Sequence, residues 1–179
     1  EIHNNTIANN SSEGEGGGLY QCYNIVNCII WGNSAPVRAQ VYDNHDMQKP
    51  IFSCIQDWTR DGEGNISEDP QMRDPDGDEF HIMRSSPCIN AGCLIEGIDE
   101  DYDGDPRPMD FPFIERGDGS DFDMGADEYL IEISARLIRY HILRIYTIHP
   151  SRFYLADVNQ DRGIDVSDLL LFLEESPSH

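Results

Sequence analysis

Basic residues are scarce in this chain of 179 residues, which has 12 lysines and arginines against 34 acidic residues. The formal net charge of −22 at pH 7 argues against nucleic acid and anionic membrane surfaces as partners, since both need a basic surface. The sequence also lacks an apolar run long enough to span a bilayer, so we expect no membrane span. Its five cysteines contain no CxxC pair and are odd in number, which fits neither a Cys metal cluster nor a small disulfide scaffold.

A helical period is also missing before residue 130. Short β-branched runs that end in polar or Gly/Asn residues recur instead, and they read NTIANNS (5–11), CIIWGNS (28–34), SCIQD (53–57) and PCINAG (87–92). Such a spacing favours a solenoid of stacked parallel strands, with a β-sandwich of short strands as the alternative. In a solenoid, Asn10 and Asn33 would form a ladder at one corner. The expected internal aliphatic stack consists of Ile7, Ile30, Ile55 and Ile89.

Six segments resemble the C-terminal part of secreted bacterial proteins with a right-handed parallel β-helix, the architecture of pectate lyases. The segments are NCIIWGNSAP, IFSCIQD, GEGNISEDPQM, DEFHIMRSSPCINAG, DYDGDPRP and FDMGADEY, and the resemblance covers about residues 1–129. It implies an all-β, right-handed parallel β-helix fold and an extracellular or cell-surface location. Because the chain opens inside the repeating pattern, we expect it to be a fragment of a longer protein.

The uneven distribution of charge suggests further divisions. Residues 57–128 hold 22 acidic residues and five arginines, a net charge of −17 (5 − 22), whereas residues 130–152 hold four arginines and one acidic residue. We predict β-helix rungs over 1–95, an acidic loop and capping region over 96–129, an amphipathic connecting segment over 130–156, and a calcium loop with a helix over 157–179. Apolar residues in the connecting segment keep a helical spacing, although those at 131–137 also alternate as in a strand.

The stretch DEDYDGDPRPMD, from Asp99 to Asp110, concentrates six carboxylates and one arginine in twelve residues. Acidic residues alternate before Gly104 and another acid ends the stretch, which is the ligand spacing of a calcium-binding loop. Prolines at 106 and 108 exclude the second helix of an EF-hand. The predicted calcium ligands are Asp99, Asp101, Asp103, Asp105 and Asp110. A solvated acidic loop is the alternative, and Asp105 could instead pair with Arg107.

The C-terminal stretch DVNQDRGIDVSD has a second calcium-loop pattern, followed by a helix that Asp165 or Ser167 would open. The predicted ligands are Asp157, Asn159, Asp161, Asp165 and Asp168. The stretch resembles one calcium-binding repeat of a type I dockerin, the module that anchors secreted polysaccharide-degrading proteins to cohesins, which implies a cohesin partner. Arg162 replaces the usual glycine, and the given sequence holds one such repeat where dockerins carry two, so a complete cohesin-binding surface is not expected from this stretch.

No catalytic constellation stands out in the sequence. Its six histidines are scattered, with His81 interpreted as an ordinary strand residue. No basic cluster is evident on the repeats, where a polysaccharide lyase would need one beside a cation. We therefore expect extracellular binding or adhesion linked to carbohydrate, with structural Ca²⁺, a polysaccharide ligand and no catalytic residue. The alternatives are a polysaccharide lyase or glycoside hydrolase whose catalytic rungs lie upstream, tethered through the dockerin-like tail, and a purely structural stalk.

Overall fold

The computed structural model describes residues 1–43, 49–109, 114–130, 142, 156 and 163–175. The chain divides into two compact units, Glu1–Leu130 and Ile131–His179, and their boundary adjoins the change in composition near residue 129. The predicted amphipathic segment 130–156 lies almost wholly outside the described residues. Among the described helices, none has the length and apolar character needed to cross a membrane.

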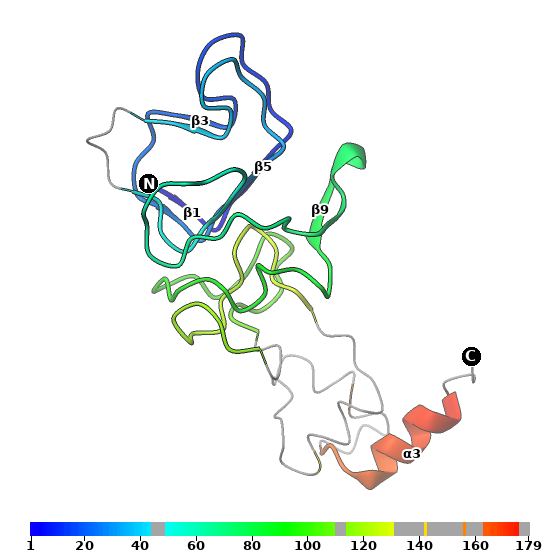
Figure 1. Cartoon of the computed structure of the whole chain (residues 1–179). Helices are drawn as coiled ribbons and strands as arrows, with labels where there is room; N and C mark the ends of the chain where they lie inside the picture. The colour runs from blue at the N-terminus through cyan, green and yellow to red at the C-terminus, as the bar shows by residue number, and fades with distance from the viewer. Residues whose placement is uncertain (44–48, 110–113, 131–141, 143–155, 157–162, 176–179) are drawn as a thin grey trace. The chain divides into compact units, whose positions relative to one another are not determined.

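The described part of the first unit is all-β, with short strands joined by long loops (Figure 1). The strands are β1 (Ile2–His3), β2 (Thr6–Ala8), β3 (Leu19–Tyr20), β4 (Ile25–Val26), β5 (Ile29–Trp31), β6 (Val41–Tyr42), β7 (Cys54–Ile55), β8 (Met72–Asp74) and β9 (Glu79–Ile82). The pairs β1–β4, β3–β6 and β2–β5–β7 are all parallel. Because each pairing joins residues more than 20 positions apart and is parallel, the chain returns to the same end of the sheet before it forms the next paired strand.

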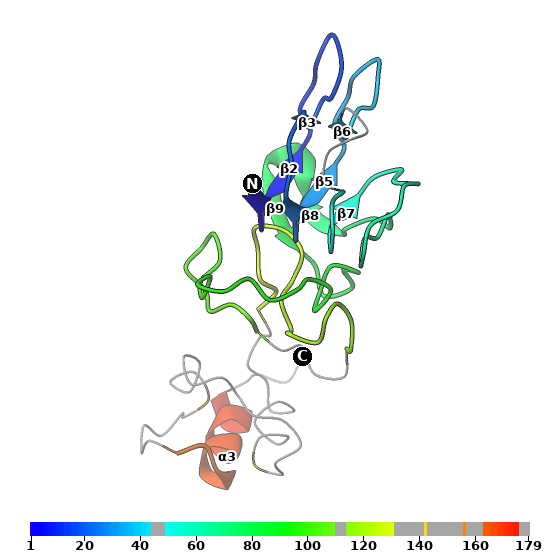
Figure 2. The ribbon, with the colours of Figure 1, turned by 90° about the vertical axis from the view of Figure 1, so that its left-hand side faces the viewer.

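The central sheet is β2–β5–β7, whose strands lie side by side in Figure 2. Ile7 pairs with Ile30, which pairs with Ile55, so three of the four residues predicted to stack do so. The two faces of β5 are both covered, since Ile29 and Ile30 point to opposite sides and each is 0% exposed. A strand that is buried on both faces has a continuous apolar sequence, which explains the CII sequence at 28–30.

The corner after the central sheet is held by amide side chains. The main-chain N–H and Nδ2 of Asn10 donate to Oδ1 of Asn33, at 3.0 and 3.1 Å, which confirms the predicted ladder. Asn33 Nδ2 donates in turn to Ile7 O (2.9 Å) and to Gln40 Oε1 (2.8 Å). The residue before each of these asparagines has a left-handed backbone conformation, Asn9 with φ 57° and Gly32 with φ 68°.

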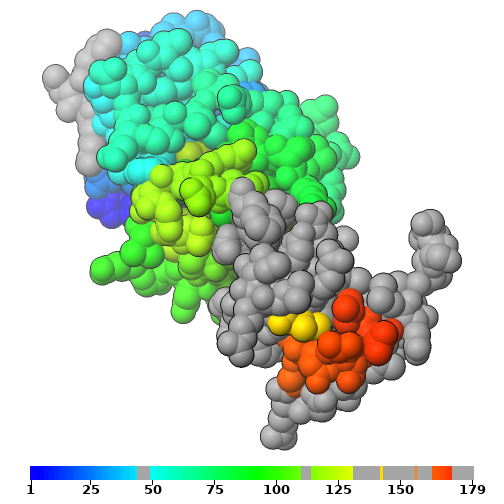
Figure 3. Space-filling model, turned by 60° about the horizontal axis from the view of Figure 1, so that its bottom comes forward, coloured from blue at the N-terminus to red at the C-terminus, as the bar shows by residue number. Residues whose placement is uncertain are grey.

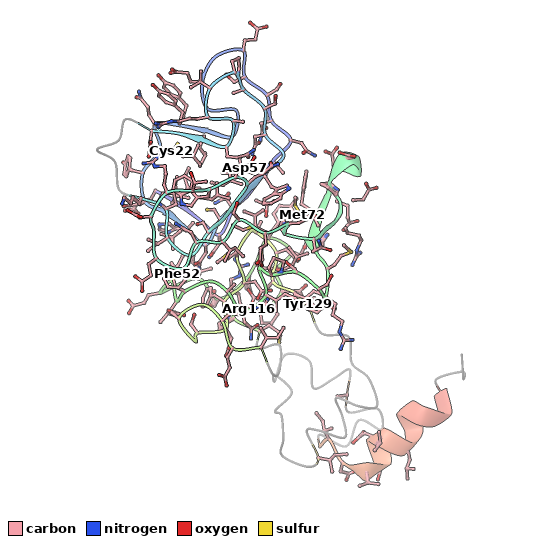
Figure 4. The ribbon with its side chains drawn as sticks, in the orientation of Figure 1. Cys22, Phe52, Asp57, Met72, Arg116 and Tyr129 are labelled. Carbon is pink, nitrogen blue, oxygen red and sulfur yellow. The ribbon has the colours of Figure 1, made fainter. Side chains whose placement is uncertain are left out.

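Two apolar clusters fill the unit. Ile30 and Ile55 belong to one, which also contains Leu19 and Val41. Ile89 belongs to the other, so the expectation that it extends the Ile7 stack is wrong. The second cluster covers the opposite face of β5 and β7, because the chain after residue 70 folds back over these strands instead of adding to their sheet. Figure 4 places Cys22, from the first cluster, near β3, and Met72, from the second, nearer β9.

The antiparallel hairpin β8–β9 is closed by the short 3₁₀ turn η1 (Pro75–Gly77). After it, the described segments 83–109 and 114–130 form no strand apart from an isolated bridge between Glu100 and Pro106. Figure 3 shows residues 114–130 packed against neighbours from earlier in the same unit. The second unit contributes one described helix, α3 (Val166–Glu175).

Candidate functional site

The predicted calcium loop at 99–110 is organised by one of its own carboxylates. Asp101 Oδ1 accepts hydrogen bonds from the main-chain N–H groups of Asp103 and Asp105, both at 2.9 Å, and Oδ2 accepts one from Glu128 N at 2.9 Å. Each oxygen therefore already has a main-chain donor. Asp101 acts here as a turn-forming acceptor, and the tight loop forms around it.

Asp103 lies apart from this arrangement and faces a histidine. His81 Nε2 lies 2.7 Å from Asp103 Oδ2, and Asp127 completes the group, with the three ligand atoms within 4.8 Å of one another. Within the described ranges, this is the one group of three His, Cys, Asp or Glu side chains whose ligand atoms converge in this way. The structure therefore brings together His81, Asp103 and Asp127, and it does not bring Asp99 or Asp101 to the same point.

Three segments distant in sequence position this cluster. His81 is held by β9, and the main-chain N–H of its neighbour Ile82 donates to Asp127 Oδ2 at 2.8 Å. The main chains of the other two segments are joined by a hydrogen bond from Tyr102 N to Ala126 O at 3.1 Å. The three residues are 22 and 24 positions apart, close to the offsets of 22 to 25 residues between the paired strands, but no recurring sequence motif marks them.

Glu79 adds a second contact to the histidine. Its Oε1 lies at His81 Nδ1, so the ring stands between two carboxylates. The His81 pKa is raised above its usual value, and the largest cause is the hydrogen bond to Asp103. Burial opposes this effect and lowers the pKa, whereas the hydrogen bond to Glu79 raises it further. Burial raises the pKa of Asp127, and the hydrogen bond from Ile82 N lowers it. In this geometry a proton lies between Nε2 and Asp103.

A metal ion would have to replace that proton. A neutral ring that donates from Nδ1 to Glu79 presents the Nε2 lone pair beside the oxygens of Asp103 and Asp127, which is the carboxylate–histidine–metal arrangement. One imidazole nitrogen and two carboxylates are donors that suit Zn²⁺ or Mn²⁺ better than Ca²⁺, which prefers six to eight oxygens. The residues present therefore fit a divalent transition metal.

Two cavities adjoin the cluster and share its three side chains. One has a volume of about 400 Å³, and Phe80 and the exposed Tyr102 contribute to its lining. The other, of about 270 Å³, is also lined by Arg73 and Asp105. A cation at the cluster would thus be reached from solvent on more than one side.

A buried ionic group lies behind the loop. Arg107 Nε donates to Glu128 Oε2 at 2.7 Å, with the two side chains 1% and 0% exposed. Arg107 therefore pairs with Glu128, and the pairing considered for Asp105 is not formed. Burial raises the pKa of Glu128 to about 7, and burial with repulsion from Glu128 raises that of Asp123. Because both carboxylates are 0% exposed, this group holds the fold and cannot meet a substrate.

The remaining predicted ligands divide into two sets. Asp165 Oδ1 accepts a hydrogen bond from Ser167 N (2.6 Å), and Asp168 Oδ2 accepts one from Asp165 N (2.8 Å). This reciprocal arrangement is a capping box, so Asp165 opens α3 as one of the two predicted caps. The ligands that fall outside the described residues are Asp110, Asp157, Asn159 and Asp161.

Comparison with protein-family models, with curated proteins and with solved structures gave no match for the chain.

Proposed function

We propose that this chain is a right-handed parallel β-helix domain of a secreted or cell-surface protein, and that it binds carbohydrate with the help of a divalent cation. The domain itself is non-catalytic in this proposal. The tail at 157–179 is proposed as a dockerin-like calcium loop, with a cohesin as its partner.

The parallel pairings support the β-helix. Ile2 pairs with Ile25 and Thr6 with Ile29, both at an offset of 23 residues, and Leu19 pairs with Val41 at an offset of 22. These three pairings join the same two stretches of chain, and the next pairing along the sheet, Ile29 with Cys54, has an offset of 25 residues. Offsets of similar size at successive levels of the sheet favour rungs of similar length, which stacking requires. The amide ladder at Asn10 and Asn33 adds the side-chain pairing that such a corner needs.

The observation that carries the binding function is the position of the His81–Asp103–Asp127 cluster on the wall of the 400 Å³ cavity. A cation held there by three side chains keeps coordination positions open, and vicinal hydroxyl groups of a sugar can fill them. Phe80 and Tyr102 supply aromatic surface, and Asn5 and Thr6 supply polar groups, on the same cavity wall. Aromatic surface with a few placed polar groups is typical of a small-ligand site.

A glycan panel with the intact chain tests this function. We expect binding that chelator abolishes and that Zn²⁺, Mn²⁺ or Ca²⁺ restores to different degrees. Asp103→Asn should weaken binding about tenfold or more, since a charged ligand is lost. Asp61→Asn is the matched control, because Asp61 is 91% exposed and pairs only with Lys49 among the described residues. Chelator-insensitive binding with full affinity in Asp103→Asn would contradict the proposal.

One observation favours a polysaccharide lyase as the second candidate. Arg73 lines the 270 Å³ cavity together with His81, Asp103 and Asp127, so a basic residue does lie beside the candidate cation site. A lyase needs this combination to stabilise the charge that develops when a proton is removed next to a carboxylate. Incubation with uronate polymers should then yield an unsaturated, ultraviolet-absorbing product, and Arg73→Ala should abolish it. Absence of any product in the presence of cation would leave the non-catalytic function.

A further inference from the structure

The two carboxylate members of the cation cluster, Asp103 and Asp127, are connected by a side chain that is not a member. Asp101 directs one oxygen to each of the two segments that carry them. Its Oδ1 accepts a hydrogen bond from Asp103 N, and its Oδ2 accepts one from Glu128 N, both at 2.9 Å. One carboxylate therefore joins the main chains of two ligand-bearing segments that lie 24 residues apart in the sequence.

The peptide group between Asp127 and Glu128 is held at both of its polar atoms. Its N–H donates to Asp101 Oδ2, and its carbonyl oxygen accepts a hydrogen bond from Nη2 of Arg107 at 2.8 Å. The Asp127 side chain is oriented separately, because its Oδ2 accepts the hydrogen bond from Ile82 N at 2.8 Å. The main chain and the carboxylate of this cluster member are thus both fixed by the protein's own hydrogen bonds.

The loop that carries Asp103 is closed by the same Asp101 carboxylate. Oδ1 accepts a second hydrogen bond, from Asp105 N at 2.9 Å, and Asp101 N donates to Asp105 O at 2.9 Å. From this closed turn the Asp103 side chain reaches His81 Nε2. Hydrogen bonds behind a ligand-bearing segment fix the direction of the ligand, and their loss typically lowers metal affinity 10–100-fold.

Asp101 itself is kept away from a cation at the cluster. It lies outside the group of converging ligand atoms, and three main-chain N–H groups take three of the roughly four acceptor positions of its carboxylate. A cation that drew Asp101 in as a ligand would open the turn that presents Asp103. The cluster therefore offers few oxygens, whereas Ca²⁺ takes six to eight and Zn²⁺ is satisfied by about four ligands in total.

We infer that Asp101 is a positioning residue that sets the metal preference of the cluster. It holds Asp103 and Asp127 at the spacing of a transition-metal site, and it keeps the loop from supplying the further oxygens that Ca²⁺ needs. The inference rests on the proposed cation-dependent function and deepens it, since it names a divalent transition metal as the cation and Asp101 as the residue that selects it. Asp101 acts through the main chain and does not touch the metal.

Metal titrations of the intact chain, after removal of metal with chelator, test this role. Co²⁺ is the probe, because its visible absorption strengthens as the coordination number falls from six to four, and Zn²⁺ or Ca²⁺ is added to displace it. Asp101→Asn is compared with Asp118→Asn. Asp118 is the matched control, since it also accepts main-chain hydrogen bonds, from Leu94 N and Ser120 N, both at 3.0 Å, and these donors lie outside both ligand-bearing segments.

The expected result is a change in metal preference as well as in affinity. In the wild type, Zn²⁺ should displace Co²⁺ at a far lower concentration than Ca²⁺ does. Asp101→Asn should lower Zn²⁺ affinity about tenfold or more, reduce the preference for Zn²⁺ over Ca²⁺, and weaken the Co²⁺ absorption. Asp118→Asn should change none of these. A loss of stability alone would lower both affinities alike and would leave the preference as it was.

Hydrogen exchange in the wild type keeps the inference testable if Asp101→Asn disturbs the fold. The amides of Asp103, Asp105 and Glu128 should exchange slowly before Zn²⁺ is added and no faster afterwards, because Asp101 keeps its three donors. Faster exchange at these amides on adding Zn²⁺ would make Asp101 a ligand and overturn the inference, as would an unchanged metal preference in Asp101→Asn. In either case a cation still binds and the proposed function stands; if no cation binds at the cluster, both fall.

Discussion

Single carboxylates satisfy main-chain N–H groups throughout the strand-poor segments after residue 83. Asp101 has three such donors, and Asp123 accepts from Asn90 N (2.6 Å) and Tyr129 N (2.7 Å). Where few strands exist, the main chain needs other acceptors, because a buried N–H without a partner costs free energy. Much of the acidic charge of this region therefore has a structural role that is independent of any cation.

Among these residues, the buried Arg107 is the one whose substitution should destabilise the fold most. It donates to Glu128 and to the main-chain oxygens of Gly125 (3.1 Å) and Asp127 (2.8 Å). Arg107→Met should lower the free energy of unfolding by about 3–5 kcal/mol, since two buried carboxylates lose their cation. Denaturant titration measures this loss, which should shrink at acidic pH as the carboxyls protonate. Arg73→Met, at a side chain 64% exposed, should cost less than about 1 kcal/mol; a similar loss in both variants would contradict the assignment.

His81 gives the unit a pH dependence of known sign. Its pKa is raised in the folded chain, chiefly by the hydrogen bond to Asp103, so the proton binds more tightly in the folded than in the unfolded state. The resulting stabilisation is fully present below the unfolded pKa of about 6.5 and is lost as pH rises through the folded value.

Melting curves in chelator across this range should show the midpoint falling with pH in the wild type and a flatter profile in His81→Gln. Added Zn²⁺ should lower the apparent His81 pKa, because metal and proton compete for Nε2; an NMR titration that metal leaves unchanged would argue against the cation site.

At the scale of elements, substitutions of Asp165 at the start of α3 can distinguish its role as a helix cap from its predicted role as a calcium ligand. Asparagine caps a helix as well as aspartate does but is a weaker ligand for a cation. Asp165→Asn should therefore preserve helical circular dichroism without calcium and reduce the gain on adding calcium. Asp165→Ala should lose about 1 kcal/mol of helix stability even in chelator. Identical calcium titrations for wild type and Asp165→Asn would remove Asp165 from the ligand set.

The Asn10–Asn33 ladder leads to a prediction about the stability of the paired strands. Asn33 is 6% exposed; its side chain accepts a hydrogen bond from Asn10 N and donates to Ile7 O and to the side chain of Gln40. Asn33→Ala should lower the free energy of unfolding by about 1–3 kcal/mol, since buried donors and acceptors lose their partner. Asn10→Ala, at an exposed position, should cost clearly less. Hydrogen exchange at Asn10 N and denaturant titration measure the two effects, and equal losses would count against the ladder.

For the whole molecule, the net charge of −22 is a source of self-repulsion that bound cations would reduce. We expect the thermal midpoint to rise on adding Ca²⁺ or Zn²⁺ and to fall in chelator, by mass action on the folded state. An equal concentration of Na⁺ in charge equivalents is the control for screening. A midpoint that chelator does not change would show that no tightly bound cation stabilises the fold.

The all-β class, the 23-residue offset between Ile7 and Ile30, and the Asn10–Asn33 ladder followed from the sequence, because a strand repeat leaves a local pattern of apolar and Gly/Asn residues. The opening of α3 at Asp165 or Ser167 followed from capping preferences, which are equally local. Asp99, Asp101 and Asp103 looked alike at alternate positions, however, and sequence spacing could not tell a main-chain acceptor from a ligand.

The tertiary structure alone decided that Asp101 forms the turn, that Asp103 meets His81 and Asp127, and that Ile89 joins the second core. It also brought Arg38 and Arg60 onto Asp43, although their separation of 22 residues, the same as the Leu19–Val41 offset, is visible in the sequence. The contacts of Asp101, Asp103 and Ile89 depend on how the chain after residue 70 folds back over the sheet. Such long-range packing has no signature in the local period of a sequence, because it is fixed by the shape and burial of the whole unit.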